Sequence, residues 1–219
     1  MFLMLLIGQR IINYPLNLRL VNRPTNVQYS ESNLMLQHNS VQIQDVITCE
    51  RNKIKKEMML FDYPAGRNIQ PAKQLSDLTL ETGGIPIRSV VITTWRSGST
   101  FFGDIINSLP ANYYHYEPLS NLEIIQIRNE SDFRATLALS NIKKFLQCDY
   151  SDMESYIKLA NKRPIFLYNK RLWRVCKLYP KFCYRPDFLT SHCRLFPLQS
   201  MKIVRLRLSL AGKLLDDSQ

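Results

Sequence analysis

The chain is poor in glycine and histidine, and it lacks the usual patterns of a metal site. It has 7 glycines and 3 histidines among 219 residues. No Cys-x-x-Cys pair occurs, and His192 is the only histidine near the cysteine-rich part, so a zinc site is poorly supported. No carboxylate cluster that could hold a cation is present either. We therefore expect no metal.

Long apolar runs are also missing. Residues 1–7 are apolar, but Gly8, Gln9 and Arg10 then interrupt the run. A membrane-spanning helix needs about 20 predominantly apolar residues. No charged segment precedes the run, and no clear cleavage site of small residues follows it. The sequence thus predicts no membrane anchor in this chain.

The strongest pattern is a β-branched run that leads through a short loop into an apolar-periodic segment, over residues 90–102. Strand, tight turn and helix together direct free backbone N–H groups at an anion. Gly98 allows a close approach of the backbone, Arg96 adds a forked cation, and Ser99 or Thr100 could cap the helix. Many such turns in α/β proteins bind nothing, so this alternative stays open.

The same loop departs from the phosphate loop of ordinary nucleotidases. That loop has the pattern G-x-x-x-x-G-K-[ST]. Thr93 stands in place of the first glycine, and Ser99 stands in place of the lysine. The pattern therefore argues against an ATPase or GTPase and favours a site for a phosphate or sulfate donor.

Positive charge is concentrated in the C-terminal third. The formal net charge is +11, with 29 Lys and Arg against 18 Asp and Glu. Nearly all of the excess lies in residues 143–213. Such a region could attract polyanions or could be an ordinary solvated face. No nucleic-acid-binding motif is present, so nucleic acid is not an expected partner.

Four of the five cysteines lie in this basic third, at positions 148, 176, 183 and 193, whereas Cys49 stands apart. An even set of cysteines in irregular sequence is typical of disulfides in an oxidising compartment. Free buried thiols remain the alternative, and the pairing cannot be read from spacing. Asn129 begins an Asn-Glu-Ser sequon and is a candidate glycosylation site.

The chain divides into two parts at a boundary near residues 82–86, which include two glycines and Pro86. Residues 1–85 are rich in Asn and Gln and predict a stem-like, poorly ordered region. Residues 86–219 alternate strands and helices, which predicts an α/β fold with a mostly parallel sheet. The expected strands cover residues 89–94, 113–116, 165–168 and 203–206; the expected helices cover 101–108, 133–146, 151–160 and 208–215.

Three separated motifs within residues 87–217 resemble one known family. Residues 93–103 resemble the 5′-phosphosulfate loop of the Golgi carbohydrate sulfotransferases, and residues 114–119 resemble their Tyr-Glu-Pro segment. Residues 202–215 resemble their basic strand and following helix. The most similar branch comprises the galactose, N-acetylglucosamine and N-acetylgalactosamine 6-O-sulfotransferases.

The resemblance implies a P-loop-like sulfotransferase fold and a Golgi location, usually with a membrane anchor. It also implies transfer of sulfate from 3′-phosphoadenosine 5′-phosphosulfate, without a metal, to a primary hydroxyl of a glycan. Keratan- or chondroitin-type chains, or glycans that end in N-acetylglucosamine, are the expected acceptors. The residues expected to bind the donor are Arg96, Ser97, Gly98, Ser99, Thr100 and Phe101.

The same resemblance gives roles in the chemistry. Arg96 is expected to offset charge on the leaving phosphate, and Glu117 to act as general base. His115, two residues before Glu117 and so on the same face of an extended strand, is the alternative base. Pairing of Glu117 with an arginine would give it a structural role instead. Anion binding is assigned to Lys202, Arg205 and Arg207.

One departure from the family concerns its 3′-phosphate site. That site contains an Arg-Asp-Pro sequence, which does not occur here. We therefore expect residues 86–219 to be the N-terminal part of a sulfotransferase domain, truncated at its C-terminus. Such a chain would bind the donor weakly and turn over poorly. The alternative function is a catalytically inactive, basic glycan-binding module.

Overall fold

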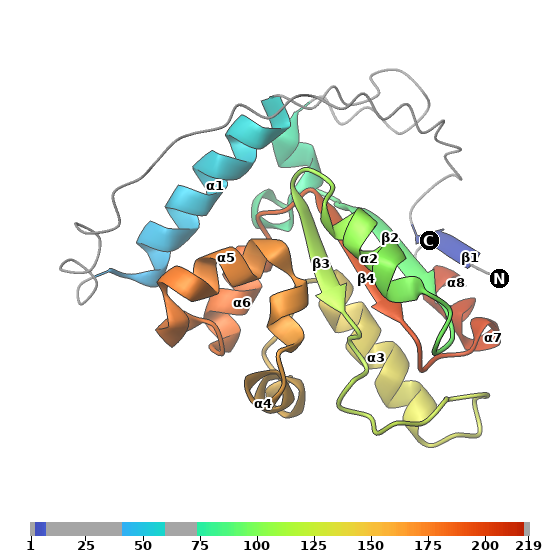
Figure 1. The fold of residues 1–219 in the computed structure, drawn as a ribbon. Coiled ribbons are helices and arrows are strands. Elements are labelled where there is room, and N and C mark those ends of the chain that lie inside the picture. The colour runs from blue at the N-terminus through green and yellow to red at the C-terminus, as the bar shows by residue number, and fades with distance from the viewer. Residues whose placement is uncertain (1–2, 8–40, 60–73, 217–219) are drawn as a thin grey trace.

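The computed structural model describes residues 3–7, 41–59 and 74–216, which contain a four-stranded sheet with helices around it (Figure 1). The strands, in sheet order, are β1 (Leu3–Ile7), β2 (Ile87–Ile92), β4 (Leu198–Ile203) and β3 (Asn112–Tyr116). Strands β2, β4 and β3 are parallel, and β1 pairs antiparallel with β2. The prediction of an α/β fold with a mostly parallel sheet is confirmed.

Helices fill most of the remaining described chain. The α-helices are α1 (Ile43–Met59), α2 (Ser99–Asn107), α3 (Arg134–Leu146), α4 (Glu154–Lys162), α5 (Lys170–Leu178), α6 (Pro186–Cys193), α7 (Leu208–Ala211) and α8 (Lys213–Asp216). The 3₁₀ helices are η3 (Leu75–Leu78), η4 (Leu80–Thr82), η5 (Ile165–Tyr168) and η6 (Pro180–Phe182). Within the described residues, no helix has the length and apolar character needed to cross a membrane.

The two faces of the sheet are covered by different helices, as the alternation along β3 shows. Tyr114 points to α2: a Cβ built on Gly103 would lie 2.2 Å from the Tyr114 hydroxyl, so only glycine fits there. His115 points the other way, and its ring centroid lies 5.2 Å from that of Phe145 in α3. Strand β4 lies between β2 and β3, and the helices on the two sides of the sheet leave its residues 199–203 buried on both faces.

The carboxyl ends of the three parallel strands meet at one edge of the sheet. Residues 93–98 follow β2, Glu117 follows β3, and residues 204–207 follow β4. The register pairs Tyr116 with Lys202, and Ile92 with Ile203. Ligands of open α/β sheets bind at this edge. The three segments singled out in the sequence are therefore brought together by the topology.

Three expected elements differ from the structure. The helix expected over residues 208–215 is divided into α7 and α8. Residues 165–168 form η5 instead of a strand. The last strand covers Leu198–Ile203 instead of residues 203–206. In addition, α5 and α6 form within a stretch in which the sequence showed no clear periodicity.

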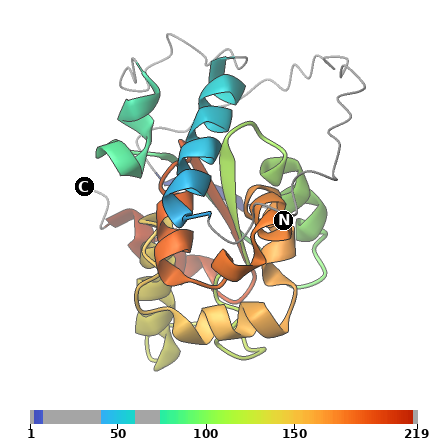
Figure 2. The same ribbon diagram turned by 90° about the vertical axis from the view of Figure 1, so that its left-hand side faces the viewer.

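The expectation of a poorly ordered region over residues 1–85 is wrong for α1. Val46, Ile47 and Ile54 of α1 are buried in the same core as the sheet. The helix lies against α6 (Figure 2). Residues 8–40 and 60–73, which this expectation also covers, lie outside the described residues.

A buried carboxylate fixes α1 to the rest of the fold. The Glu50 side chain is 3% exposed, and it accepts hydrogen bonds from Lys53 at 2.6 Å and from Arg174 of α5 at 2.7 Å. His192 of α6 lies 4.0 Å from the same carboxylate. Burial raises the pKa of Glu50, but His192, Lys53 and Arg174 together outweigh it and hold this pKa well below its usual range.

We expect Glu50→Gln to lower the free energy of unfolding by about 2 kcal/mol at pH 7, because it breaks a buried charged network. Since the folded state holds the pKa of Glu50 low, the difference from wild type should shrink as the pH falls below about 4.3. Urea unfolding at several pH values measures this difference in the free energy of unfolding. Glu57→Gln is the matched control. Glu57 lies in α1, as Glu50 does, and pairs with Arg171 of α5, but its side chain is 30% exposed. Equal effects of the two substitutions would contradict the burial argument.

Candidate functional site

The loop after β2 has the geometry of an anion cradle. The N–H of Thr93 donates to the carbonyl of Ile203 at 3.0 Å, and the Thr93 and Ser97 hydroxyls lie 2.6 Å apart. Arg96 and Gly98 have φ angles of 65° and 77°, so the backbone turns sharply at both. Gly98, not Ser99 or Thr100, occupies the N-cap of α2, and no side chain caps the helix.

Backbone donors at this turn are free to bind a ligand. Among the described residues, no acceptor is found for the N–H groups of residues 97–100. The Arg96 side chain is exposed and has no hydrogen-bond or ion-pair partner in the described part of the chain. Ser99 is buried, whereas Phe101 is 73% exposed. The free N–H groups and the Arg96 guanidinium can bind the same oxyanion.

Glu117 lies at the same edge of the sheet as this loop and is paired with two cations. The strand ends at Tyr116, and Glu117 has a φ of 42°, which turns its carboxylate toward β4. Lys202 donates to one carboxylate oxygen at 2.9 Å, and Arg205 donates to the other at 3.1 Å. Burial raises the pKa of Glu117, but Lys202 and Arg205 outweigh it and lower this pKa below its usual value.

Lys202 and Arg205 are themselves fixed. Lys202 is 1% exposed, and its Nζ lies 4.5 Å from the centroid of the Tyr116 ring. The Nε of Arg205 donates to the carbonyl of Glu123 at 2.7 Å. A buried lysine and a buried arginine around one carboxylate leave the group with one net positive charge. This surplus favours an anion beside Glu117.

Tyr116 contacts residues from three parts of the site: Thr100 at the start of α2, Lys202 of β4 and Tyr168 of η5. Its ring stacks on that of Tyr168 in η5 with centroids 3.9 Å apart. The pKa of Tyr116 is raised by burial first, and then by the charges of Glu117 and Tyr168. The Tyr116 side chain also interacts with the side chain of Thr100. Tyr116 and Tyr168 were not expected as site residues. The only signal for Tyr116 was its place beside Glu117, and none existed for Tyr168.

His115 is not part of this site. Its expected position on the same face as Glu117 is wrong, because the alternation of the strand ends at Tyr116. The His115 ring is 3% exposed, and its Nδ1 lies 3.2 Å from the Tyr150 hydroxyl. Burial lowers its pKa to about 3. We therefore withdraw His115 as a candidate base.

The remaining singled-out residues lie outside the Glu117 group. The Arg207 side chain is exposed, and the backbone N–H of Arg207 donates to the carbonyl of Ile127 at 3.1 Å. Asn129 is exposed, and its amide oxygen accepts from the Ser131 hydroxyl at 2.8 Å. An exposed sequon is accessible to a glycosylating enzyme, so Asn129 stays a predicted glycosylation site.

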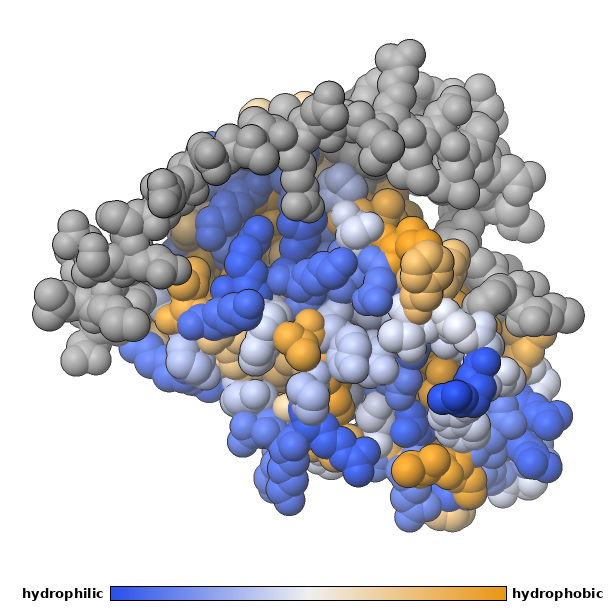
Figure 3. Space-filling view, in the orientation of Figure 1, coloured by the Kyte–Doolittle hydropathy of each residue, from blue (hydrophilic) through white to orange (hydrophobic). Residues whose placement is uncertain are grey.

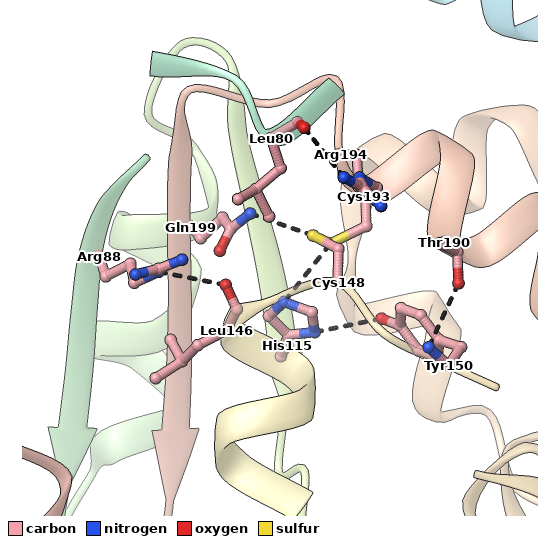
Figure 4. Close-up of a disulfide and its surroundings, with 10 residues drawn as sticks. All are labelled: Leu80, Arg88, His115, Leu146, Cys148, Tyr150, Thr190, Cys193, Arg194 and Gln199. Atoms are coloured by element: carbon pink, nitrogen blue, oxygen red, sulfur yellow. Dashed lines mark hydrogen bonds between the residues drawn. A yellow bond between two sulfur atoms is a disulfide. The ribbon is translucent and has the colours of Figure 1, made fainter. Parts of the chain in front are cut away.

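The cysteines of the basic third form two disulfides. Cys148 pairs with Cys193, and Cys176 pairs with Cys183, while Cys49 is free and exposed. Figure 4 shows Cys148–Cys193 between His115 and Gln199, whose amide donates to Cys148 at 3.0 Å. No group of three His, Cys, Asp or Glu residues suited to a metal occurs in the described ranges. The expectation of disulfides is confirmed.

Comparisons with known proteins add nothing to this geometry. The chain matches no protein-family model, no curated protein and no solved structure.

Proposed function

We propose that the chain is a carbohydrate 6-O-sulfotransferase that uses 3′-phosphoadenosine 5′-phosphosulfate. The observation that carries the proposal is the meeting of three segments at the carboxyl edge of the parallel sheet. They are the open loop around Gly98, Glu117, and the buried pair of Lys202 and Arg205. Their family resemblance was seen in three separate stretches of sequence, and the fold places all three at one edge.

In this proposal the loop holds the phosphosulfate of the donor. The free N–H groups of residues 97–100 bind its oxygens, and Arg96 stabilises the charge that develops on the leaving phosphate. Ser97, Ser99 and Thr100 supply hydroxyls, and Phe101 lies exposed beside the anion. No step requires a metal.

The sugar hydroxyl attacks sulfur in line with the leaving phosphate. A sulfur–oxygen bond to the sugar forms while the bond to the phosphate breaks, and adenosine 3′,5′-bisphosphate leaves. Glu117 takes the hydroxyl proton. Its low pKa makes it a weak base, which suffices if the transition state is loose and the hydroxyl becomes acidic only as the new bond forms. Lys202 and Arg205 supply positive charge to the sulfuryl oxygens.

Two features support a glycan acceptor in the Golgi lumen. The two disulfides fit an oxidising compartment, and Asn129 is an exposed sequon. The acceptor would be a keratan- or chondroitin-type chain, or a glycan that ends in N-acetylglucosamine.

We expect Arg96→Ala combined with Ser99→Ala to weaken donor binding about tenfold, since a charged hydrogen bond is lost. Equilibrium dialysis with sulfur-labelled donor measures the affinity, and label transfer to desulfated keratan or chondroitin measures the reaction. Arg163→Ala is the control, because Arg163 is an exposed arginine at the end of α4, far from the loop in sequence. Unchanged donor affinity in the double variant would overturn the donor site. Magnesium-dependent ATP hydrolysis by the wild type would also overturn it.

Glycan binding without transfer is the second candidate function. It is favoured by the ion pairs that occupy both oxygens of Glu117 and by the concentration of lysine and arginine over residues 143–213. Retention of sulfated glycans by a chain that transfers no label would favour it.

A further inference from the structure

A second surface of interest lies on α5, outside the Glu117 site. An open groove of about 550 Å³ runs along this helix. It is lined by Leu167, Lys170, Trp173, Arg174, Lys177 and Leu178. We call it the α5 groove. Three of these side chains are apolar, and the other three are cations from successive turns of the helix. In Figure 3, hydrophilic side chains with apolar ones between them cover the region where α5 lies in Figure 1.

The cations of the α5 groove are mostly unneutralised. Lys170 and Lys177 are exposed and have no carboxylate partner among the described residues. Arg174 donates to Glu50 from the inner side, yet 44% of its side chain remains exposed. No acidic residue lines the groove. Its field is therefore positive, and a bound anion would not have to displace an existing ion pair at either lysine.

The spacing of these cations suits an extended ligand. At 1.5 Å per residue, Lys170 and Lys177 lie about 10 Å apart along the helix axis. Trp173 lies between them in sequence and is half-buried against the core, which fixes the indole. A fixed indole between two cations offers a flat apolar surface for a sugar ring and a cation for an acidic group on either side.

Neighbouring residues of η5 link the α5 groove to the Glu117 site. Strand β3 is at the edge of the sheet, and η5 and α5 lie along it (Figure 1). Leu167 of the groove precedes Tyr168, which stacks on Tyr116 next to Glu117. A chain-like ligand that enters the Glu117 site can thus extend over η5 onto α5.

We propose that the α5 groove binds a sulfated glycan chain, one or more sugars away from the reacting hydroxyl. The choice of a glycan rests on the proposed function, whereas the choice of an anionic chain rests on the unpaired lysines. Sulfate groups bind Lys170 and Lys177, and a sugar face stacks on Trp173. The groove would hold the part of the glycan that already carries sulfate and so favour acceptors with sulfated neighbours. Nucleic acid fits the charge but not the oxidising compartment that the disulfides indicate.

Charge reversal tests the groove directly. We expect Lys170→Glu combined with Lys177→Glu to weaken binding of chondroitin sulfate at least tenfold, while donor affinity stays within twofold. Lys158→Glu combined with Lys162→Glu is the matched control, because these exposed lysines of α4 give the same charge change and do not line the groove. Equal losses in both double variants would show a diffuse charge effect and overturn the proposal.

Tryptophan fluorescence provides a second readout. The chain has 2 tryptophans, so Trp95→Phe leaves Trp173 as the sole reporter. Chondroitin sulfate should change its emission in a saturable way, and fully desulfated chondroitin should change it far less. No response, or an equal response to a DNA oligonucleotide, would overturn the proposal. A saturable response in a chain that binds no donor would uphold the groove and reject the proposed function.

Discussion

Replacing Cys148 and Cys193 together by alanine should lower the free energy of unfolding by about 4 kcal/mol. The pair closes a loop with a sequence separation of 45, and the loss of loop entropy in the unfolded chain grows with that length. The bond connects the end of α3 to the last turn of α6. Nearby, the N–H of Tyr150 donates to the Thr190 hydroxyl at 3.2 Å, which a loosened α6 would also lose.

The second disulfide is the matched comparison. Cys176 and Cys183 are separated by only 7 residues, so the same reasoning gives about 2.4 kcal/mol for Cys176→Ala with Cys183→Ala. Urea unfolding of both double variants measures which disulfide contributes more to the free energy of unfolding. The variants are made in a Cys49→Ser background, because the free thiol of Cys49 could exchange with the disulfides. An equal or reversed order would contradict the loop-length argument. A native mass that shows five free thiols in the wild type, instead of the single thiol of Cys49, would contradict the disulfides themselves.

The parallel sheet was predictable where its strands were apolar. Residues 90–92 of β2 form an unbroken β-branched run, and such runs are typical of strands buried on both faces. The sequence of β4 conceals the same burial, because Gln199, Ser200 and Lys202 are polar yet buried. Each of these side chains forms a hydrogen bond with a residue distant in sequence: Gln199 with Cys148, Ser200 with Asn112 and Lys202 with Glu117. Partners distant in sequence cannot be read from a local pattern.

The helices over residues 167–197 were missed for a related reason. Residues 165–168 are a four-residue apolar run, and periodicity over so few residues does not separate a strand from a helix. Asn169 was a usable signal, because its side chain accepts from the N–H groups of Arg171 and Leu172 and caps α5. Leu172, Val175 and Cys176 then follow a helical spacing.

The segments that form the site could be predicted from the sequence, but the ion pairs between them could not. Local sequence indicated the loop around Gly98, and the basic strand indicated Lys202. The alternation that placed His115 beside Glu117 fails because the backbone turns into the left-handed region at Glu117. A residue with a side chain rarely adopts a positive φ, so the two-residue alternation of a strand gives no sign of this turn. The pairing of Glu117 with both Lys202 and Arg205 became visible only in three dimensions.

Glu117→Gln should reduce sulfate transfer at least a hundredfold, the usual contribution of a general base, while donor affinity stays within twofold. Single-turnover label transfer with the protein in excess over donor detects slow rates. Glu123→Gln is the matched control, because the Glu123 carboxylate is 78% exposed and, within the described ranges, bonds only Arg134 at 3.3 Å. A loss of transfer in both variants would contradict the assigned role of Glu117. An unchanged rate in Glu117→Gln would contradict it as well.

The pH dependence separates this role from a purely structural one. Because Lys202 and Arg205 hold the pKa of Glu117 below its usual value, the carboxylate stays ionised as the pH falls from 7 to about 5. Wild-type transfer should therefore show no loss attributable to Glu117 in that range. The stability that its ion pairs contribute is fully present above about pH 4.3 and is lost as the pH falls through the lowered pKa of the folded state. The difference in unfolding free energy between wild type and Glu117→Gln should follow the same course. A difference that disappears between pH 7 and 6 would mean that Lys202 and Arg205 do not stabilise the charged carboxylate, and the assigned geometry of the site would be wrong.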